Sequence, residues 1–383
     1  MRRLDLANFR AYVDARLELD PRPVVLTGPN GAGKTNLLEA LSFLAPGRGL
    51  RRASLAEAAR HGAGPLWAVS ARVDTPGGEV ALGTGPDPDA PQANRRTVRI
   101  NGAAAASQTA LAEHLTVSWL TPQMDRLFLG PAGDRRRFLD RIVYGFDPAH
   151  AGRVSAYEQA MRERNRLLKQ GVLDDAWLGG LEQVMAETGV AVAAARADVV
   201  ARLRAAIAQA GEGAFPNPDL ALDGATEGAL AERRPALEVE DGLRAELARR
   251  RRLDAAAGVT TDGPHRTDLH VSHAAKGVAA DQCSTGEQKA LLIGLVLANA
   301  RLLAADRGVP PLLLLDEVAA HLDAARRAAL FDAVLALGSQ AWMTGTDALL
   351  FEALGDRAQW ISVHQSTLSP GRAASPSIPQ ATR

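Results

Sequence analysis

The sequence predicts an α/β fold, a mixed sheet with helices that is interrupted by an inserted helical arm. The apolar run Val24-Val25-Leu26 is followed by a glycine-rich loop and then by leucines at helical spacing. A second apolar run, residues 312–315, ends in Asp316 and Glu317. Both runs are typical of buried strands. In residues 130–255, Ala, Glu, Arg and Leu recur at helical spacing, which predicts the arm.

The remaining strands follow from alternation and from turn residues. Residues 1–26 alternate between apolar and polar side chains in the manner of paired strands. Trp119 and Leu120 close another strand, and Gln123 follows where the chain turns. Further strands are predicted at residues 66–73, 96–100 and 341–346, with a loop rich in Gly, Pro and Asp at 76–94.

These elements predict four parts of the chain. Residues 1–129 and 256–365 form the head that contains the sheet, and residues 130–255 form the arm. Residues 366–383 are rich in Ser, Pro and Ala, which is typical of a disordered tail.

Residues 28–35 match the phosphate-binding pattern G-x-x-x-x-G-K-[ST] in the strand–loop–helix context that the pattern requires. Glycines let backbone N–H groups close around phosphates, and the helix N-terminus adds positive potential. Lys34 would reach the β- and γ-phosphates, and the Thr35 hydroxyl would bind Mg²⁺. An ordinary glycine turn is the alternative, which a full match in this context disfavours. We expect a nucleoside triphosphate to be held by Gly28, Pro29, Asn30, Gly31, Ala32, Gly33, Lys34 and Thr35.

Charge and cysteine content limit the classes of function. The 44 basic and 44 acidic residues balance, so a surface for nucleic acid must be a local patch. Cys283 is the only cysteine, which excludes an internal disulfide and fits a reducing compartment. The apolar run 290–298 is too short to cross a bilayer. We therefore expect a cytoplasmic protein with no membrane partner.

The segment Ser284-Thr285-Gly286-Glu287-Gln288 leads into an apolar helix at residues 291–303. Taken locally it is a capping box, with Ser284 as the N-cap and Glu287 three residues later. A phosphate-binding loop, this helix start and a strand ending in Asp316-Glu317 occur in that order along the chain. In that order they resemble the ATP-binding-cassette ATPase head.

The resemblance implies a role for each of these residues, with ATP and Mg²⁺ as cofactors. Asp316 would hold Mg²⁺ through water, and Glu317 would polarise the attacking water. Gln123 is similar to the glutamine that senses Mg²⁺ and the water. Ser284 and Gly286 would contact the γ-phosphate bound by a partner subunit, so two heads would meet around two ATP molecules.

Three further stretches look like the RecF family, bacterial recombination mediators related to SMC and Rad50 heads. They are residues 8–12 (Asn-Phe-Arg-Ala-Tyr), 135–140 (Arg-Arg-Arg-Phe-Leu-Asp) and 263–269 (Gly-Pro-His-Arg-Thr-Asp-Leu). The resemblance implies ATP-dependent dimerisation and binding to single-stranded, gapped or junction DNA. It also implies cooperation with RecO and RecR in loading RecA, support of the SOS response, and weak DNA-dependent ATP hydrolysis.

Three alternatives are weighed against an ATPase whose cycle opens and closes a DNA clamp. One is a binding module in which ATP locks the dimer and hydrolysis only resets it, which turnover with and without DNA would distinguish. An SMC-like DNA-bridging protein needs a long coiled coil, for which residues 130–255 are too short and too interrupted. A transport ATPase needs a switch histidine near the end of the last strand, where this chain has Thr344-Gly345-Thr346. That difference also favours slow hydrolysis.

Several arginines are candidates for the surface that binds DNA. The alternative for each of them is an ordinary solvated side chain. The basic loop 46–52 has equal claims as a solvated connection and as a phosphate contact. His265 and Arg266 are more typical of a structural loop than of a catalytic pair. The candidate DNA contacts are Arg48, Arg51, Arg52, Arg135, Arg136, Arg250 and Arg251, the last two within the run 249–252.

Overall fold

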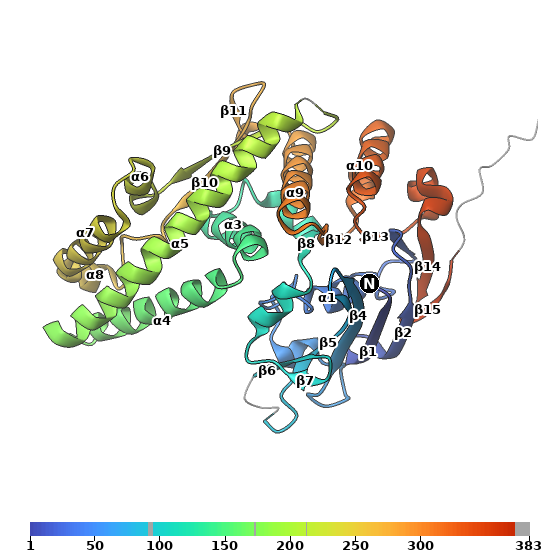
Figure 1. The fold of residues 1–383 in the computed structure, drawn as a ribbon, viewed down its shortest axis with the longest axis horizontal. Coiled ribbons are helices and arrows are strands. Elements are labelled where there is room, and N and C mark those ends of the chain that lie inside the picture. The colour runs from blue at the N-terminus through green and yellow to red at the C-terminus, as the bar shows by residue number, and fades with distance from the viewer. Residues whose placement is uncertain (91–94, 172–173, 212, 372–383) are drawn as a thin grey trace, which may run out of the picture. The chain divides into compact units, whose positions relative to one another are not determined.

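The structure is a computed structural model that describes residues 1–90, 95–171, 174–211 and 213–371 (Figure 1). The chain forms two compact units. The first unit combines Met1–Met124 with Asn299–Arg383, and the second is the continuous segment Asp125–Ala298.

The first unit contains a six-stranded sheet that carries the phosphate-binding loop. Its order is β15-β14-β3-β13-β12-β8, and β3 (Val24–Thr27) lies between β13 and β14. All pairs are parallel except β14 with β15. The other strands are β8 (Val117–Leu120), β12 (Leu312–Leu315), β13 (Ala341–Gly345), β14 (Gln359–His364) and β15 (Thr367–Pro370). Parallel strands align their carboxyl ends, so β3, β12 and β13 deliver their following residues to one edge.

A second six-stranded sheet in this unit is antiparallel, with the order β2-β1-β4-β5-β6-β7. Its strands are β1 (Arg3–Phe9), β2 (Tyr12–Glu18), β4 (Ala68–Thr75), β5 (Gly78–Pro86), β6 (Arg96–Ile100) and β7 (Ala103–Ala104). The segment 76–94 was predicted as a loop, and that prediction is wrong for β5. Glycines at both ends of this strand hide its short alternation of Val80 and Leu82.

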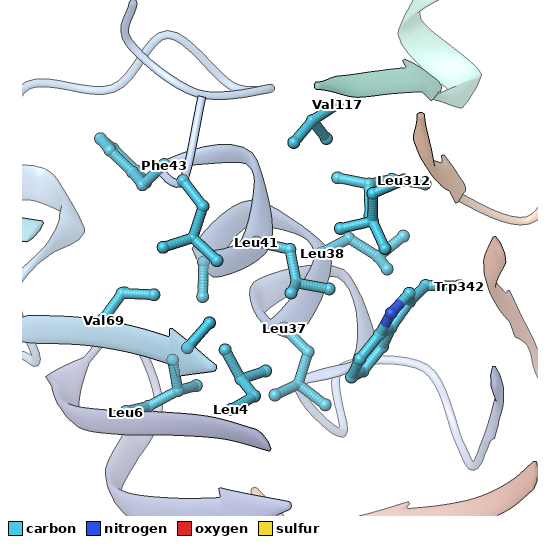
Figure 2. Close-up of a cluster of buried hydrophobic side chains, with 14 of the residues drawn as sticks. Leu4, Leu6, Leu37, Leu38, Leu41, Phe43, Val69, Val117, Leu312 and Trp342 are labelled. Carbon is cyan, nitrogen blue, oxygen red and sulfur yellow. The ribbon is translucent and has the colours of Figure 1, made fainter. Parts of the chain in front are cut away.

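The core of the first unit gathers around α1 (Lys34–Ser42) (Figure 2). Leu37, Leu38 and Leu41 of this helix are fully buried. Side chains from both sheets join the same cluster, among them Leu4, Leu6, Val69, Leu312 and Trp342. Burying such a set of leucines and aromatics stabilises the fold by about 1.5–3 kcal/mol for each side chain. The helix that begins at Lys34 is thereby fixed against both sheets.

The second unit is mainly helical. Helix α4 (His150–Lys169) packs along α5 (Asp175–Ala210), which begins with Asp174 accepting a hydrogen bond from the Trp177 amide. The other helices are α3 (Ala132–Phe146), α6 (Ala225–Ala231), α7 (Ala236–Arg249) and α8 (Arg251–Ala257). A small antiparallel sheet completes the unit, in the order β11 (Val278–Ala279), β10 (Asp268–His273), β9 (Pro218–Asp223).

This small sheet moves the boundary of the unit away from the predicted one. Residues 130–255 were expected to form the arm, and residues 256–365 were expected to return to the head. Instead β10 pairs with β9 over six residue pairs, which ties residues 268–273 to the helical unit. Strand β9 follows the long helix α5 and was not predicted.

The remaining helices are α2 (Leu55–Ala58), α9 (Thr285–Arg307) and α10 (Ala324–Leu337). Helix α9 is long and apolar enough to meet the length and composition of a membrane span, but 72% of its most apolar window is buried within the protein. Such burial is that of a core helix. The tail was predicted to be disordered from residue 366, and this is wrong for β15; residues 372–383 lie outside the described residues.

Candidate nucleotide-binding site

The phosphate-binding loop joins β3 to α1 and requires glycine at both ends. Gly28 has a φ of +151°, and a Cβ atom there would lie 2.0 Å from the Val363 carbonyl oxygen. Gly33 has a φ of +111°, and a Cβ there would lie 2.9 Å from the Tyr12 hydroxyl. Only glycine fits both positions without moving a neighbour. No side chain caps the N-terminus of α1, which suits an anion site at this end of the helix.

Lys34 begins α1 and folds back over the loop. Its Nζ donates hydrogen bonds to the carbonyl oxygens of Gly28 at 2.6 Å and Pro29 at 2.9 Å. Burial lowers the pKa of the lysine, and the charges of Glu317 and Asp316 partly oppose this shift. The ammonium group is thus positioned along the loop, where phosphates would meet it.

Thr35 is hydrogen-bonded to Asp316, which follows β12. The Thr35 hydroxyl lies 3.0 and 3.1 Å from the two carboxylate oxygens of Asp316. Thr344, at the end of β13, donates to the same carboxylate at 2.8 Å. Burial raises the pKa of Asp316, against the two hydroxyl groups, which lower it. The edge of the parallel sheet thus brings together a hydroxyl and a carboxylate separated by 281 residues.

Glu317 is held in a left-handed backbone conformation, with φ 52° and ψ 20°. Its backbone N–H donates to the Thr344 hydroxyl oxygen at 2.8 Å. A non-glycine residue in this region is strained by about 1–3 kcal/mol, and such strain concentrates at functional sites. Thr344 therefore fixes the orientation of Asp316 and Glu317 together.

These residues fit a magnesium–nucleotide ligand. Mg²⁺ takes oxygen ligands and is usually held by one or two protein groups together with phosphates and waters. The Thr35 hydroxyl and the Asp316 carboxylate supply such oxygens side by side. Among the described residues there is no cluster of three or more His, Cys, Asp or Glu side chains, so no all-protein metal cage competes with this arrangement.

Two segments remote in sequence support the loop from outside. The Tyr12 hydroxyl, on β2, donates to the Gly33 carbonyl oxygen at 3.1 Å. The turn between β14 and β15 reaches the loop as well, because the Ser366 N–H donates to the Ala32 carbonyl oxygen at 2.9 Å. Both turn residues, Gln365 and Ser366, have positive φ. The C-terminal hairpin is therefore part of the site.

The basic loop 46–52 is partly tied to α1. Arg51 donates to Asn36 at 3.0 Å and to Glu39 at 3.2 Å, and Arg10 forms a bidentate pair with the same fully buried Glu39. The charge of Arg51 also lowers the pKa of Asp316, although burial outweighs it. Arg48 and Arg52 are exposed. Arg51 therefore lies beside the site.

Gln123 and Ser284 form no hydrogen bond with the described residues around the phosphate-binding loop. Gln123 is exposed and forms no hydrogen bond with Thr35 or Asp316, although it follows β8, the strand beside β12. Ser284 belongs to the second unit. Its N–H donates to the Glu287 carboxylate at 3.0 Å and its hydroxyl oxygen accepts from the Glu287 N–H at 3.4 Å, as the predicted capping box requires. Gly286 is exposed, and a Cβ atom there would meet nothing.

Most of the arm's candidate DNA contacts are bonded within the protein. Arg135 pairs with Asp268 at 2.6 and 2.7 Å, and Arg136 donates to the Thr267 carbonyl oxygen. Arg250 pairs with Glu246, and Arg251 pairs with Glu182 and Asp175. Donors used in ion pairs are less available to phosphates, so the prediction that Arg135, Arg250 and Arg251 bind DNA has little support in their geometry. Arg136 forms no ion pair with the described residues and uses only one donor.

His265 is a structural residue. Its Nε2 lies 3.0 Å from the Thr260 carbonyl oxygen and must donate there, which leaves Nδ1 to accept from the Tyr157 hydroxyl at 2.7 Å. Burial lowers the pKa of the imidazole, so the neutral form is favoured. For His265, this geometry agrees with the interpretation of His265 and Arg266 as part of a structural loop.

Sequence reasoning missed three residues that shape the site: Tyr12, Thr344 and Ser366. Thr344 was noted only because it stands where transport ATPases have their switch histidine. Its position directly after a buried apolar strand, parallel to β12, was the one usable signal. Tyr12 and Ser366 act through contacts with Gly33 and Ala32 that no local pattern could indicate.

The fold and the site define an SMC-like ATPase head. The model of the RecF/RecN/SMC N-terminal domain matches residues 1–367. A solved Smc head domain from Pyrococcus furiosus, with an extended coiled coil and bound to the C-terminal domain of ScpA, shares this fold. Its TM-score is 0.52 at 15% identity, over 96% of this chain and 94% of that one.

Closer relatives narrow the class. The chain is 54% identical over 363 residues to the DNA replication and repair protein RecF of Agrobacterium fabrum (strain C58 / ATCC 33970), which covers 94% of this chain and 96% of the relative. The structure of the recombination mediator protein RecF-ATP in the RecFOR pathway has a TM-score of 0.83 at 20% identity, over 97% of each chain. The chain belongs to the RecF family of DNA replication and repair proteins. This confirms the family resemblance that the motifs indicated.

Proposed function

We propose that this protein binds ATP with Mg²⁺, dimerises on it, and hydrolyses it slowly while bound to single-stranded or gapped DNA during recombinational repair. The observation that carries the proposal is the contact of Thr35 with Asp316, beside Lys34 and directly before Glu317. Few arrangements other than a nucleotide site need an ammonium, a hydroxyl and two carboxylates around an uncapped helix start.

The geometry supports a role for the residues around the loop. Lys34 would exchange its bonds to the Gly28 and Pro29 carbonyl oxygens for phosphate oxygens. Thr35 and, through water, Asp316 would hold Mg²⁺, which would neutralise phosphate charge. The family resemblance alone assigns Gln123 to the metal side of the site. Glu317, oriented by Thr344, accepts a hydrogen bond from the attacking water and positions it.

The proposals of a dimer and of protein partners depend on membership of the RecF family. Ser284 and Gly286 begin α9, exposed and at a helix N-terminus, where the γ-phosphate of a second subunit's nucleotide fits. Relatives are named as DNA replication and repair proteins and as a recombination mediator of the RecFOR pathway. We extend this to cooperation with RecO and RecR in loading RecA, in support of the SOS response, within the cytoplasm.

An SMC-like bridging function is the second candidate and has less support. It needs a coiled coil that extends far from the head, with a heptad seam. Here α5 packs back along α4 and buries Met185, Ala186 and Val190 in a local cluster with Tyr157. Among the described residues no helix is longer than the 36 residues of α5.

The test of the proposed function is Glu317→Gln beside Lys34→Met. Glu317→Gln should bind ATP normally and hydrolyse it about 10²–10⁴-fold more slowly, because one water-positioning group is removed. Lys34→Met should bind ATP weakly, because the point charge on the phosphates is removed. Calorimetry gives the affinity and phosphate release gives the rate. Normal ATP affinity in Lys34→Met would refute this site, and an unchanged rate in Glu317→Gln would assign the step to another residue.

A further inference from the structure

The Gly263–Arg266 turn is built so that three of its residues are fixed and the fourth is left free. The Arg266 N–H donates to the Gly263 carbonyl oxygen at 2.9 Å, which closes the turn. Gly263 has a φ of +125°, and a Cβ atom there would lie 2.5 Å from the Tyr157 hydroxyl. The Pro264 carbonyl oxygen accepts a hydrogen bond from Arg196 at 2.6 Å. Contacts with α4 and α5 thus fix the backbone of the turn.

The side chain of Arg266 stands apart from this network. It is exposed, and it forms no hydrogen bond or ion pair with the described residues. Its neighbour Arg136 is half-buried and donates a single hydrogen bond, to the Thr267 carbonyl oxygen at 2.7 Å. By contrast Arg135 donates to both oxygens of Asp268 and also to the Gly130 carbonyl oxygen. A guanidinium carries five donors, so Arg136 and Arg266 keep most of theirs available.

The carboxylates around the turn do not neutralise this pair. Asp268 is taken by Arg135, and Asp140 is taken by Arg196 and His150. Burial raises the pKa of Glu227, whose carboxylate accepts a hydrogen bond from the Thr267 hydroxyl. Asp262 remains, and its charge acts on His265. Burial is the largest cause of the lowered pKa of Arg136; the charges of Arg196 and Arg266 lower it further, and those of Asp268 and Asp140 oppose the shift. Arg266 is thus exposed, Arg136 is half-buried beside it, and neither forms an ion pair with the described residues.

We propose that Arg266, with Arg136 beside it, binds a backbone phosphate of DNA. This rests on the proposed function, which has the protein bind DNA. Arginine suits phosphate because its planar fork matches the oxygens. The exposed side chain on a rigid turn suits a long polyanion that passes over the surface. The site reads no bases, so it contributes affinity and position and no sequence preference.

The experiment compares Arg266→Gln with Arg266→Lys and with Arg233→Gln. Arg233 is an exposed arginine of the same unit whose side chain has no bonded partner among the described residues, so it controls for the removal of one charge. Affinity for a fluorescent gapped duplex is measured by anisotropy over a salt series, with ATP present. The thermal midpoint of each variant is measured in parallel.

Arg266→Gln should weaken binding about tenfold and lower the salt slope by about 0.9 for each phosphate that is no longer neutralised. Arg266→Lys should keep the slope and lose part of the affinity. Arg233→Gln should match the wild type, and no variant should change the thermal midpoint.

Two results would overturn the assignment of Arg266 alone. One is a slope for Arg266→Gln equal to that of Arg233→Gln. The other is an Arg266→Gln variant that binds DNA normally but no longer dimerises with ATP, which would place Arg266 at a subunit interface. A wild-type protein that binds no DNA in any nucleotide state would refute the proposed function, and this assignment with it.

Discussion

Thr344 joins the two acidic residues of the site through one hydroxyl group. It donates to Asp316 and accepts from the Glu317 N–H, and it is 1% exposed. Removing the hydroxyl leaves the partly buried Glu317 N–H and a buried Asp316 carboxylate oxygen each with one partner fewer. Leaving such a group unsatisfied costs about 1–3 kcal/mol. Among the described residues, no other side chain forms a hydrogen bond with the strained backbone of Glu317.

We therefore expect Thr344→Val to hydrolyse ATP about tenfold more slowly or worse, while it still binds the nucleotide. Valine keeps the shape of threonine and removes the hydroxyl. Thr346→Val is the matched control, because Thr346 is exposed two residues further on. Phosphate release and calorimetry separate the rate from the affinity. Equal rates in the two variants would show that Thr344 has no part in positioning Glu317.

His265 makes the second unit sensitive to acid. Its pKa in the folded protein lies below the ordinary value of 6.5, with burial as the main cause. Between the lowered pKa and 6.5 the unfolded chain therefore binds more protons than the folded chain. Stability from this residue is fully present above pH 6.5 and is lost as the pH falls below that value.

We expect the urea midpoint of the second unit to be level above about pH 6.5 and to fall on the acid side. Pulsed hydrogen exchange of α4 reports this unit separately from the first one. His265→Gln should be less stable at neutral pH and should show a smaller acid loss. His270→Gln is the control, since His270 is an exposed residue of β10. The same acid slope in His265→Gln as in the wild type would assign the loss to other groups.

At this scale the sequence predicted the residues of the site that lie within one motif. The loop 28–35 and the pair Asp316-Glu317 could be read because strand, loop and helix signals surround them. Thr344, Tyr12 and Ser366 could not, because their roles come from contacts with residues more than 20 positions away. Tyr12 lies in the family stretch 8–12, but nothing in that stretch indicates its contact with Gly33. Nor could the sequence show that Arg135 and Arg251 are bound to Asp268 and Glu182.

Among the elements, the C-terminal hairpin of β14 and β15 has the most direct effect on the nucleotide site. His364 pairs with Thr367, so Gln365 and Ser366 form a two-residue turn with positive φ at both positions. Such turns usually contain glycine or asparagine. Here the Ser366 amide holds the Ala32 carbonyl oxygen, and Val363 abuts Gly28. The hairpin thus keeps the phosphate-binding loop in shape.

We expect a chain ending after residue 364 to bind ATP about tenfold more weakly than a chain ending after residue 371. The longer chain keeps β15 and the hydrogen bond from Gly371 to Trp360. Ser366→Gly should bind ATP like the wild type, because glycine keeps the N–H and tolerates a positive φ. Calorimetry with ATP gives the affinities. Equal affinities for the two truncated chains would mean that the hairpin does not shape the loop.

The elements that sequence reasoning missed are short, and their apolar alternation is brief. Strands β5, β9 and β15 were read as loop, as part of the arm and as disordered tail, and β14 was not predicted because residues 341–346 were taken as the last strand. Each is stabilised by pairing with a strand distant in sequence or by a tight turn, and this outweighs weak local preference. The long helices and the apolar strands β3 and β12 could be predicted, because burial alone requires their patterns.

For the whole molecule, ATP-dependent pairing of two chains is the property that the family membership and Ser284 together predict. We expect Ser284→Arg to bind ATP and to remain a monomer in sedimentation with ATP, because a bulky cation obstructs the exposed helix start. Ser284→Ala removes the capping hydroxyl at a cost of about 1 kcal/mol without adding bulk, so it should still dimerise. If Ser284→Arg dimerised normally, Ser284 would be only a helix cap.

The division into units was predicted in kind but not in position. The sequence predicted a helical arm between two halves of a head, and the structure has a unit of residues 125–298 where 130–255 was expected. Part of the difference comes from β9 and β10, whose pairing adds residues 268–273 to the second unit. Helices α6, α7 and α8 lie between these two strands along the chain, so their pairing leaves no local trace in the sequence.

The order of strands in the parallel sheet has a consequence for the synthesis of the chain. Strand β3 leaves the ribosome among the first residues made, but both of its neighbours, β13 and β14, are among the last. The second unit, by contrast, is one continuous segment and is complete well before them. Since contiguous units fold as they emerge, the arm should fold during translation while β3 waits without partners. The nucleotide site would then be the final part to form, and a stalled or shortened product would carry a folded arm but no working ATPase.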